Sequence, residues 1–181
     1  MKKKTVFLLL ILTFIFALTP VTRAALVATP TSATVIVNGK PVAFDAYNIE
    51  GSNYFKLRDV AFALSGTAKQ FDAVWDGERN AISLISGKPY TVEGGEMAGK
   101  GSGNKTPVLT NSKIYLDGKE VKFTAYNIDG NNYFKLRDIG EAFDFSLVWD
   151  GASNTISIDT NKAYDSQPSP IPTPQQPEEP I

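Results

Sequence analysis

Apolar and polar positions alternate along most of the chain, and this period of two predicts strands. The runs VIVNGKPVAF (35–44) and IYLDGKEVKF (114–123) are broken by Asn-Gly or Asp-Gly, which is typical of a hairpin turn. A second hairpin is predicted where AYNI and YFKL flank a polar turn, at 50–53 and again at 129–132. A third is predicted in AVWDGERNAISLI and LVWDGASNTISI, each turning at Asp-Gly.

Between the second and third hairpins the apolar period changes from that of a strand to that of a helix. Residues at i, i+3, i+4 and i+7 are apolar in the first stretch, namely Leu57, Val60, Ala61 and Leu64. The second stretch repeats the pattern with one member missing, at Leu136, Ile139 and Phe143. Asp59 and Asp138 fall in the first turn, where the helix dipole favours a carboxylate. A short amphipathic helix therefore follows the second hairpin in both places.

The chain is a tandem repeat. AYNIEGSNYFKLRD (46–59) returns as AYNIDGNNYFKLRD (125–138), and the match extends over about fifty residues, with five extra residues in the first copy. The sequence predicts an α+β fold made of two tandem small domains, 34–90 and 114–164, each an antiparallel sheet of hairpins wrapped over one short helix. Residues 91–113 form a Gly/Ser-rich linker, which allows the repeats to be either docked or separate.

Both ends of the chain differ in composition from the repeats. Residues 1–24 combine three lysines, the apolar run VFLLLILTFIFAL and a small-residue cleavage site, which predicts a signal peptide. The apolar run is shorter than the roughly 20 residues that span a bilayer, so we expect no membrane span after cleavage. Residues 165–181 form a Pro-rich tail. The expected location is secreted and associated with the cell envelope.

Composition narrows the chemistry. After the expected cleavage, 14 basic and 19 acidic residues remain, a net charge of −5, so nucleic acid is not an expected partner. The chain has no cysteine and no histidine. This removes thiol and imidazole catalysis and imidazole metal sites, and we expect no cofactor and no metal.

The pattern NGK, G-x-x-YFKLRD, VWDG and N-x-I-S resembles the copper amine oxidase N-terminal-like domain, or stalk domain, found in tandem in exported proteins of Gram-positive bacteria. The resemblance covers both repeats and implies a small antiparallel sheet around a helix. It does not imply oxidation, because the copper and quinone of that family belong to a separate catalytic domain. The copper also needs histidines, and Tyr54 and Tyr133 are followed by Phe rather than by an acidic residue.

Strand alternation places Tyr and Lys of YFKLRD opposite Phe and Leu, on a face expected to be exposed. Duplicated tyrosines beside duplicated cations are candidate ligand contacts, although a structural role is the favoured explanation. Each tryptophan before an Asp-Gly turn either stacks on a ligand or caps the core, and burial tendencies favour the core position. The candidate ligand-binding residues are Tyr54, Lys56, Arg58, Trp75, Tyr133, Lys135, Arg137 and Trp149.

Three functions follow from these features. The first is a non-catalytic envelope module that binds cell-wall polysaccharide or a surface protein. The second is a structural spacer whose surfaces make repeat–repeat or self-association contacts. The third is a hydrolase, which would need paired carboxylates; acidic residues do cluster, but turn chemistry explains most of them, and they are Asp72, Asp76, Glu78, Asp144 and Asp150.

Overall fold

The computed structural model describes residues 25–99 and 103–165. The expected signal peptide (1–24) and the tail beyond Asp165 lie outside the described residues. The described chain forms sheets of mostly antiparallel strands with two short helices, so the predicted α+β class is confirmed. No helix in these ranges is both long and apolar enough to cross a membrane.

Each repeat has three hairpins with a helix after the second, in the predicted order. The first repeat follows the short strand β1 (Thr29–Pro30) and contains β2 (Thr34–Val37), β3 (Lys40–Pro41), β4 (Ala46–Ile49), β5 (Ser52–Lys56), α1 (Leu57–Leu64), β6 (Phe71–Asp76) and β7 (Ala81–Ser86). The second follows β8 (Val108–Leu109) and contains β9 (Lys113–Leu116), β10 (Lys119–Val121), β11 (Ala125–Ile128), β12 (Asn131–Lys135), α2 (Leu136–Ala142), β13 (Ser146–Asp150) and β14 (Thr155–Asp159).

The turns have the backbone that their sequences predict. Asn38 and Gly39 both have positive φ, at 48° and 79°, and Glu50 and Gly51 repeat this at 49° and 76°. Two successive positive φ angles define the tight turn whose twist matches that of a two-stranded hairpin. The turns therefore fix the register of both hairpins locally.

The repeats share all three sheets. The central sheet has the order β1-β4-β5-β12-β11-β8 and joins the repeats where β5 pairs antiparallel with β12, with Phe55 opposite Phe134. The outer sheets are β10-β9-β7-β6 and β13-β14-β2-β3. In each outer sheet the first hairpin of one repeat joins the third hairpin of the other, through the parallel pairs β7–β9 and β14–β2.

This sharing of strands differs from the expected arrangement of one sheet per repeat. The boundaries 34–90, 91–113 and 114–164 therefore mark the repeats in the sequence and do not separate the sheets. Chemical equivalence of the two edges permits this exchange. β7 and β14 both present Ile-Ser followed by an aliphatic residue, so β2 and β9 find the same edge on either repeat. The exchange places Ile82 beside Ile114 and Ile156 beside Val35.

Equivalent hydrogen bonds fasten the exchanged hairpins. Asn38 Nδ2 donates to Thr160 Oγ1 at 2.9 Å, and the Thr160 N–H donates to Asn38 Oδ1 at 2.9 Å. In the other outer sheet Asp117 replaces Asn38, and its Oδ1 accepts from the Ser86 N–H at 2.9 Å. Both turns therefore hold a strand of the other repeat.

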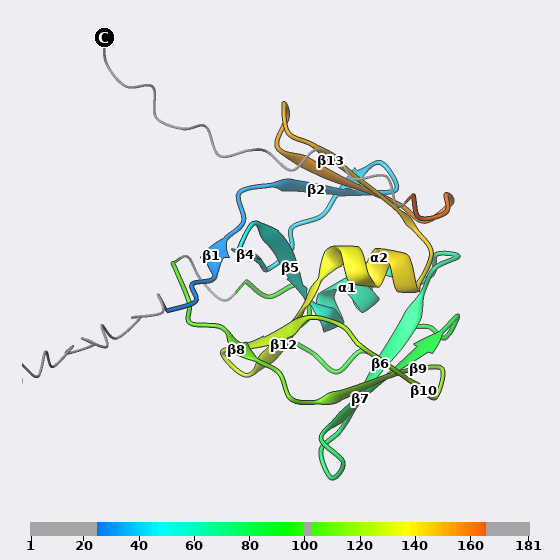
Figure 1. The fold of residues 1–181 in the computed structure, drawn as a ribbon. Coiled ribbons are helices and arrows are strands. Elements are labelled where there is room, and N and C mark those ends of the chain that lie inside the picture. Colours follow the sequence, from blue (N-terminus) through cyan, green and yellow to red (C-terminus); the bar gives the residue numbers. More distant parts are fainter. Residues whose placement is uncertain (1–24, 100–102, 166–181) are drawn as a thin grey trace, which may run out of the picture.

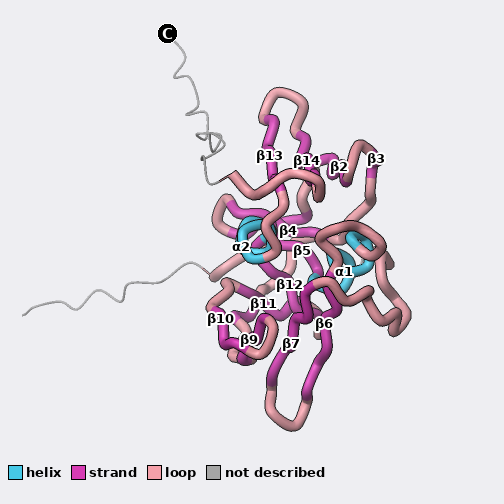
Figure 2. The backbone as a smooth tube through the Cα atoms, turned by 90° about the vertical axis from the view of Figure 1, so that its right-hand side faces the viewer, coloured by secondary structure: helices cyan, strands magenta, loops and turns pink. Residues whose placement is uncertain are grey.

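In both views the outer sheets lie at opposite ends of the molecule, with the helices and the central sheet between them (Figures 1 and 2). The largest apolar cluster occupies this interior and draws on both repeats. Phe71 stacks on Phe143 with ring centroids 4.1 Å apart, and Phe55 and Phe134 are fully buried. The core is therefore continuous across the repeats.

The other face of the central sheet is buried as well, by four tyrosines. Tyr47 meets Tyr133 edge-on at 5.4 Å, and Tyr54 meets Tyr126 at 5.1 Å, so each pair has one ring from each repeat. Alternation separates Tyr from Phe as predicted, but the expected exposure of Tyr54 and Tyr133 is wrong. The reason is that joining β5 to β12 brings the rings of one repeat onto those of the other.

Candidate functional site

Three of the eight candidate residues line one groove, and the other five do not. Lys56, Arg58 and Trp75 belong to the groove. Trp149 is half-buried against the core, Lys135 is half-buried, Arg137 is exposed, and Tyr54 and Tyr133 are buried.

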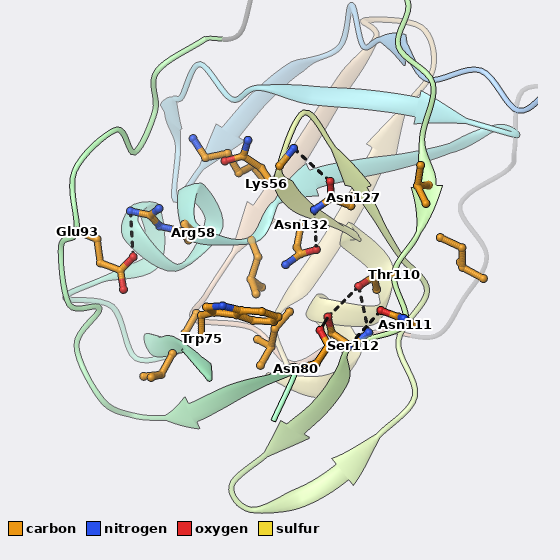
Figure 3. Close-up of a pocket in the computed structure, with 18 residues that line it drawn as sticks. Lys56, Arg58, Trp75, Asn80, Glu93, Thr110, Asn111, Ser112, Asn127 and Asn132 are labelled. Atoms are coloured by element: carbon orange, nitrogen blue, oxygen red, sulfur yellow. Dashed lines mark hydrogen bonds and ion pairs between the residues drawn. The ribbon is translucent and has the colours of Figure 1, made fainter. Parts of the chain in front are cut away.

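The groove has a volume of about 630 Å³ and is built by both repeats. The first repeat supplies the end of β5, the start of α1 and the hairpin β6–β7. The linker supplies Glu93 and residues 108–112, and the second repeat supplies residues 130–132 and Asn127 on β11. Figure 3 shows Trp75 in the middle, with Arg58 and Glu93 on one side and Asn80, Asn111 and Ser112 on the other. The site exists only because the repeats interlock.

Trp75 is 52% exposed although it lies in a strand. β6 is the last strand of its sheet, so no neighbouring strand covers its outer edge. The following Asp-Gly turn is held by Asp76, whose Oδ1 accepts from the N–H groups of Glu78 and Arg79 at 3.1 Å. A side chain on Gly77 would come within 3.3 Å of Trp75 Nε1, so the glycine leaves room for the indole. The preference for a core position, considered from sequence, is wrong for Trp75.

Side-chain amides and hydroxyls form a network on one wall of the groove. Asn80 Nδ2 donates to Asn111 Oδ1 at 3.1 Å, and Ser112 Oγ donates to Asn80 Oδ1 at 2.9 Å. On the hairpin β11–β12, Asn127 Nδ2 donates to Asn132 Oδ1 at 3.5 Å. These contacts fix the orientation of each amide on the groove wall.

The opposite wall carries Arg58, which is tied to a segment of the linker. Arg58 Nη2 contacts Glu96 Oε1 at 2.6 Å and Glu93 Oε2 at 3.4 Å, and Arg58 Nε donates to Tyr90 Oη at 2.9 Å. Burial alone would raise the pKa of Glu96, but hydrogen bonds from Tyr90, the backbone and Arg58 lower it to about 2. The guanidinium charge is therefore matched within the protein.

Lys56 is also neutralised by a neighbouring carboxylate. Its Nζ lies 3.0 Å from Asp59 Oδ1 and donates to the Gly95 carbonyl at 2.9 Å. The Met97 N–H donates to the same Asp59 oxygen at 3.0 Å, and both members of the ion pair are buried. The linker is thus docked on the start of α1 over residues 94–97.

The second repeat reproduces part of this arrangement on its own side. Asn154 Nδ2 donates to the backbone carbonyl of Ser32 at 3.0 Å, whereas the equivalent Asn80 donates to the side-chain Oδ1 of Asn111. Ala33 stands where the first side has Ser112, and Trp149 is half-buried where Trp75 is exposed. The two sides of the described chain are therefore related in backbone but different in surface.

The amides at 80, 111, 127, 131 and 132 were not identified as candidates from the sequence, because Asn is a common turn residue. A usable signal was present in the duplicated pairs Asn48/Asn53 and Asn127/Asn132, which flank the second turn of each repeat. In both pairs the first amide donates to the second, at 3.2 and 3.5 Å.

Among the residues that the structure describes, no group of three or more Asp or Glu side chains is placed to hold a metal ion. Comparisons with protein families, with curated proteins and with solved structures give no match for this chain. The resemblance to the copper amine oxidase N-terminal-like domain therefore stays a prediction.

Proposed function

We propose that the protein is a non-catalytic extracellular module that binds cell-wall polysaccharide in the Trp75 groove. One observation carries this proposal: an exposed indole lies in a groove whose wall is a network of amides and hydroxyls. A pyranose ring has an apolar C–H face that stacks on an aromatic ring and an edge of hydroxyls that needs hydrogen-bond partners. An aromatic platform beside fixed polar groups meets both needs.

The carboxylates support a binding role over hydrolysis. Glu93 is the one acidic side chain that lines the groove among the described residues, and it faces Arg58. Asp72 is buried and accepts from Lys88 and Thr91. A general acid needs a raised pKa. Despite the effect of burial, these hydrogen bonds lower the pKa of Asp72, and hydrogen bonds from Ser153 and Ala152 lower the pKa of Asp150.

Self-association as a spacer is the second candidate function. β6 and β13 are the outermost strands of the outer sheets, and each carries an exposed apolar residue, Val74 and Val148. An exposed strand edge can pair with another chain. This function predicts dimers or larger species and no wall binding.

Sedimentation with purified cell walls tests the proposal. The chain lacking residues 1–24 is compared with Trp75→Ala, with Trp75→Phe, and with Val148→Ala as a control. Val148 has the same 52% exposure as Trp75 but does not line the groove. Truncating a central aromatic contact typically costs about 2 kcal/mol of binding free energy, or roughly 30-fold in Kd.

We expect Trp75→Ala to lose wall binding by that factor, with Trp75→Phe in between and Val148→Ala unchanged. Melting curves should show all three variants folded, because both positions are half exposed. Wall binding by Trp75→Ala equal to that of the parent would refute the groove as the site. No wall binding by the parent, together with dimers in sedimentation equilibrium, would favour the spacer instead.

A further inference from the structure

Resting on the proposed function, we infer that the groove selects an uncharged sugar chain bearing acetamido groups. The property that carries the inference is the direction of the hydrogen bonds in the amide network, together with the balance of charge on the walls. Both determine which hydrogen-bonding groups and which charge a ligand must carry to bind in the groove.

Most amide oxygens in the groove already accept a hydrogen bond. Asn80 Oδ1 accepts from Ser112, Asn111 Oδ1 from Asn80, Asn132 Oδ1 from Asn127, and Asn127 Oδ1 from the Gly130 N–H. By contrast, the NH₂ groups of Asn111 and Asn132 have no protein partner within residues 25–99 and 103–165. Both residues line the groove, so a ligand that engages these NH₂ groups must offer acceptor oxygens.

Asn131 has the opposite polarity. Its Nδ2 donates to the Asp129 carbonyl at 3.0 Å, and its Oδ1 has no partner in the described part of the chain. The groove thus offers free amide donors and, on the other face of β12, a free amide acceptor. A secondary amide has one carbonyl oxygen and one N–H, so the successive acetamido groups of a sugar chain supply both kinds of partner. A hydroxyl-only sugar fills the same positions without the strong carbonyl acceptor.

The remaining surface fits the methyl end of that group. Val108 and Leu109 line the groove and are 63% and 65% exposed. Exposed apolar side chains that lie together in a groove are one mark of a ligand site. An acetamido methyl that covers them would remove apolar area from water.

Charge on the walls favours an uncharged chain. Arg58 is matched by Glu93 and Glu96, and Lys56 is matched by Asp59. A polyanion would have to compete with these internal carboxylates, and a polycation would find no unpaired acid among the described residues that line the groove. The walls of the groove therefore offer hydrogen-bonding groups to a ligand, and their charges are balanced within the protein.

The test compares three β-1,4-linked tetrasaccharides that differ only at C2, using calorimetric titration of the chain lacking residues 1–24. They carry acetamido, amino or hydroxyl groups, as in chitotetraose, its de-N-acetylated form and cellotetraose. We expect the acetamido form to bind at least ten-fold more tightly than either of the others. Equal binding of the acetamido and hydroxyl forms would overturn the inference, while wall binding that depends on Trp75 would still support the proposed function.

A matched pair of variants tests the residues. Asn132→Asp replaces the free NH₂ donor by an oxygen without changing the size of the side chain. Asn53→Asp makes the same change in the first repeat, where Asn53 accepts from Asn48 but does not line the groove. We expect Asn132→Asp to lose at least ten-fold in affinity for chitotetraose and Asn53→Asp to keep it; equal effects would overturn the assignment.

A tetra-alanine peptide is the final probe, because it offers amides without sugar rings. We expect no binding at concentrations that saturate the protein with chitotetraose. Comparable binding of the peptide would overturn the assignment to a sugar, and wall sedimentation would then decide whether the proposed function also fails.

Discussion

The buried tyrosines between the repeats lead to a quantitative prediction. Tyr133 is 1% exposed, and its hydroxyl donates to Asp45 Oδ2 at 2.7 Å, joining residues 88 positions apart and in different repeats. Tyr133→Phe removes this hydrogen bond and leaves the packing on Tyr47 in place. A hydrogen bond to a charged group contributes about 1.5–3 kcal/mol, so unfolding free energy should fall by that amount.

Tyr54→Phe is the matched control, because Tyr54 is the equivalent residue of the first repeat and is also buried. No hydrogen bond of its hydroxyl occurs within the described residues, and it packs on Tyr126 as Tyr133 packs on Tyr47. We expect Tyr54→Phe to change stability by less than about 0.5 kcal/mol.

Urea unfolding followed by tryptophan fluorescence measures both variants, and a calorimetric scan gives Tm. For a chain of this size, 1.5–3 kcal/mol corresponds to roughly 3–12 °C in Tm. A fall in Tm for Tyr133→Phe no larger than for Tyr54→Phe would refute the reasoning, because it would mean that the contact with Asp45 does not connect the repeats.

Three further predictions concern the core, the buried ion pair and pH. Phe71→Ala deletes the ring stacked on Phe143 and should cost about 3–5 kcal/mol in urea unfolding, whereas Phe62→Ala at an exposed position of α1 should cost far less. Lys56→Met leaves Asp59 buried without its cation and should cost about 3–5 kcal/mol, and Lys135→Met, at the half-buried equivalent, should be close to neutral in the same assay. The pKa of Glu96 is lowered from 4.5 to about 2, so its stabilising contribution is complete above pH 4.5 and is lost as pH falls toward 2. The difference in unfolding free energy between the parent and Glu96→Gln should therefore shrink as pH falls from 4.5 toward 2. A difference that stays constant over this range would contradict the linkage.

Local features of the fold were predictable from the sequence. Each hairpin follows from a turn dipeptide and each helix from four or fewer apolar positions, because these signals act over a few residues. The missing apolar member of the second helix is Gly140, and a side chain there would approach Leu147 Cδ1 to 2.6 Å. The gap in the pattern therefore reflects close packing of α2 on β13.

The exchange of hairpins was not predictable, because both candidate edges carry nearly the same residues. β2 pairs with β14 rather than with β7 of its own repeat, and no local signal separates the two. The burial of Tyr54 and Tyr133 follows from that long-range choice, since it depends on rings brought by the other repeat. For the same reason the groove could not be assembled from the sequence, although Arg58 and Trp75 were among its candidates.

The most direct test uses the fact that the chain has only two tryptophans. Their indole N–H groups give two signals in a ¹⁵N-correlated NMR spectrum, and a Trp149→Phe variant assigns them. On titration with chitotetraose, the account predicts a progressive shift of the Trp75 signal with little change at Trp149, which lies half-buried outside the groove. An unmoved Trp75 signal at saturating sugar, or equal shifts of both signals, would contradict the claim that the interlocked repeats build a sugar site around Trp75.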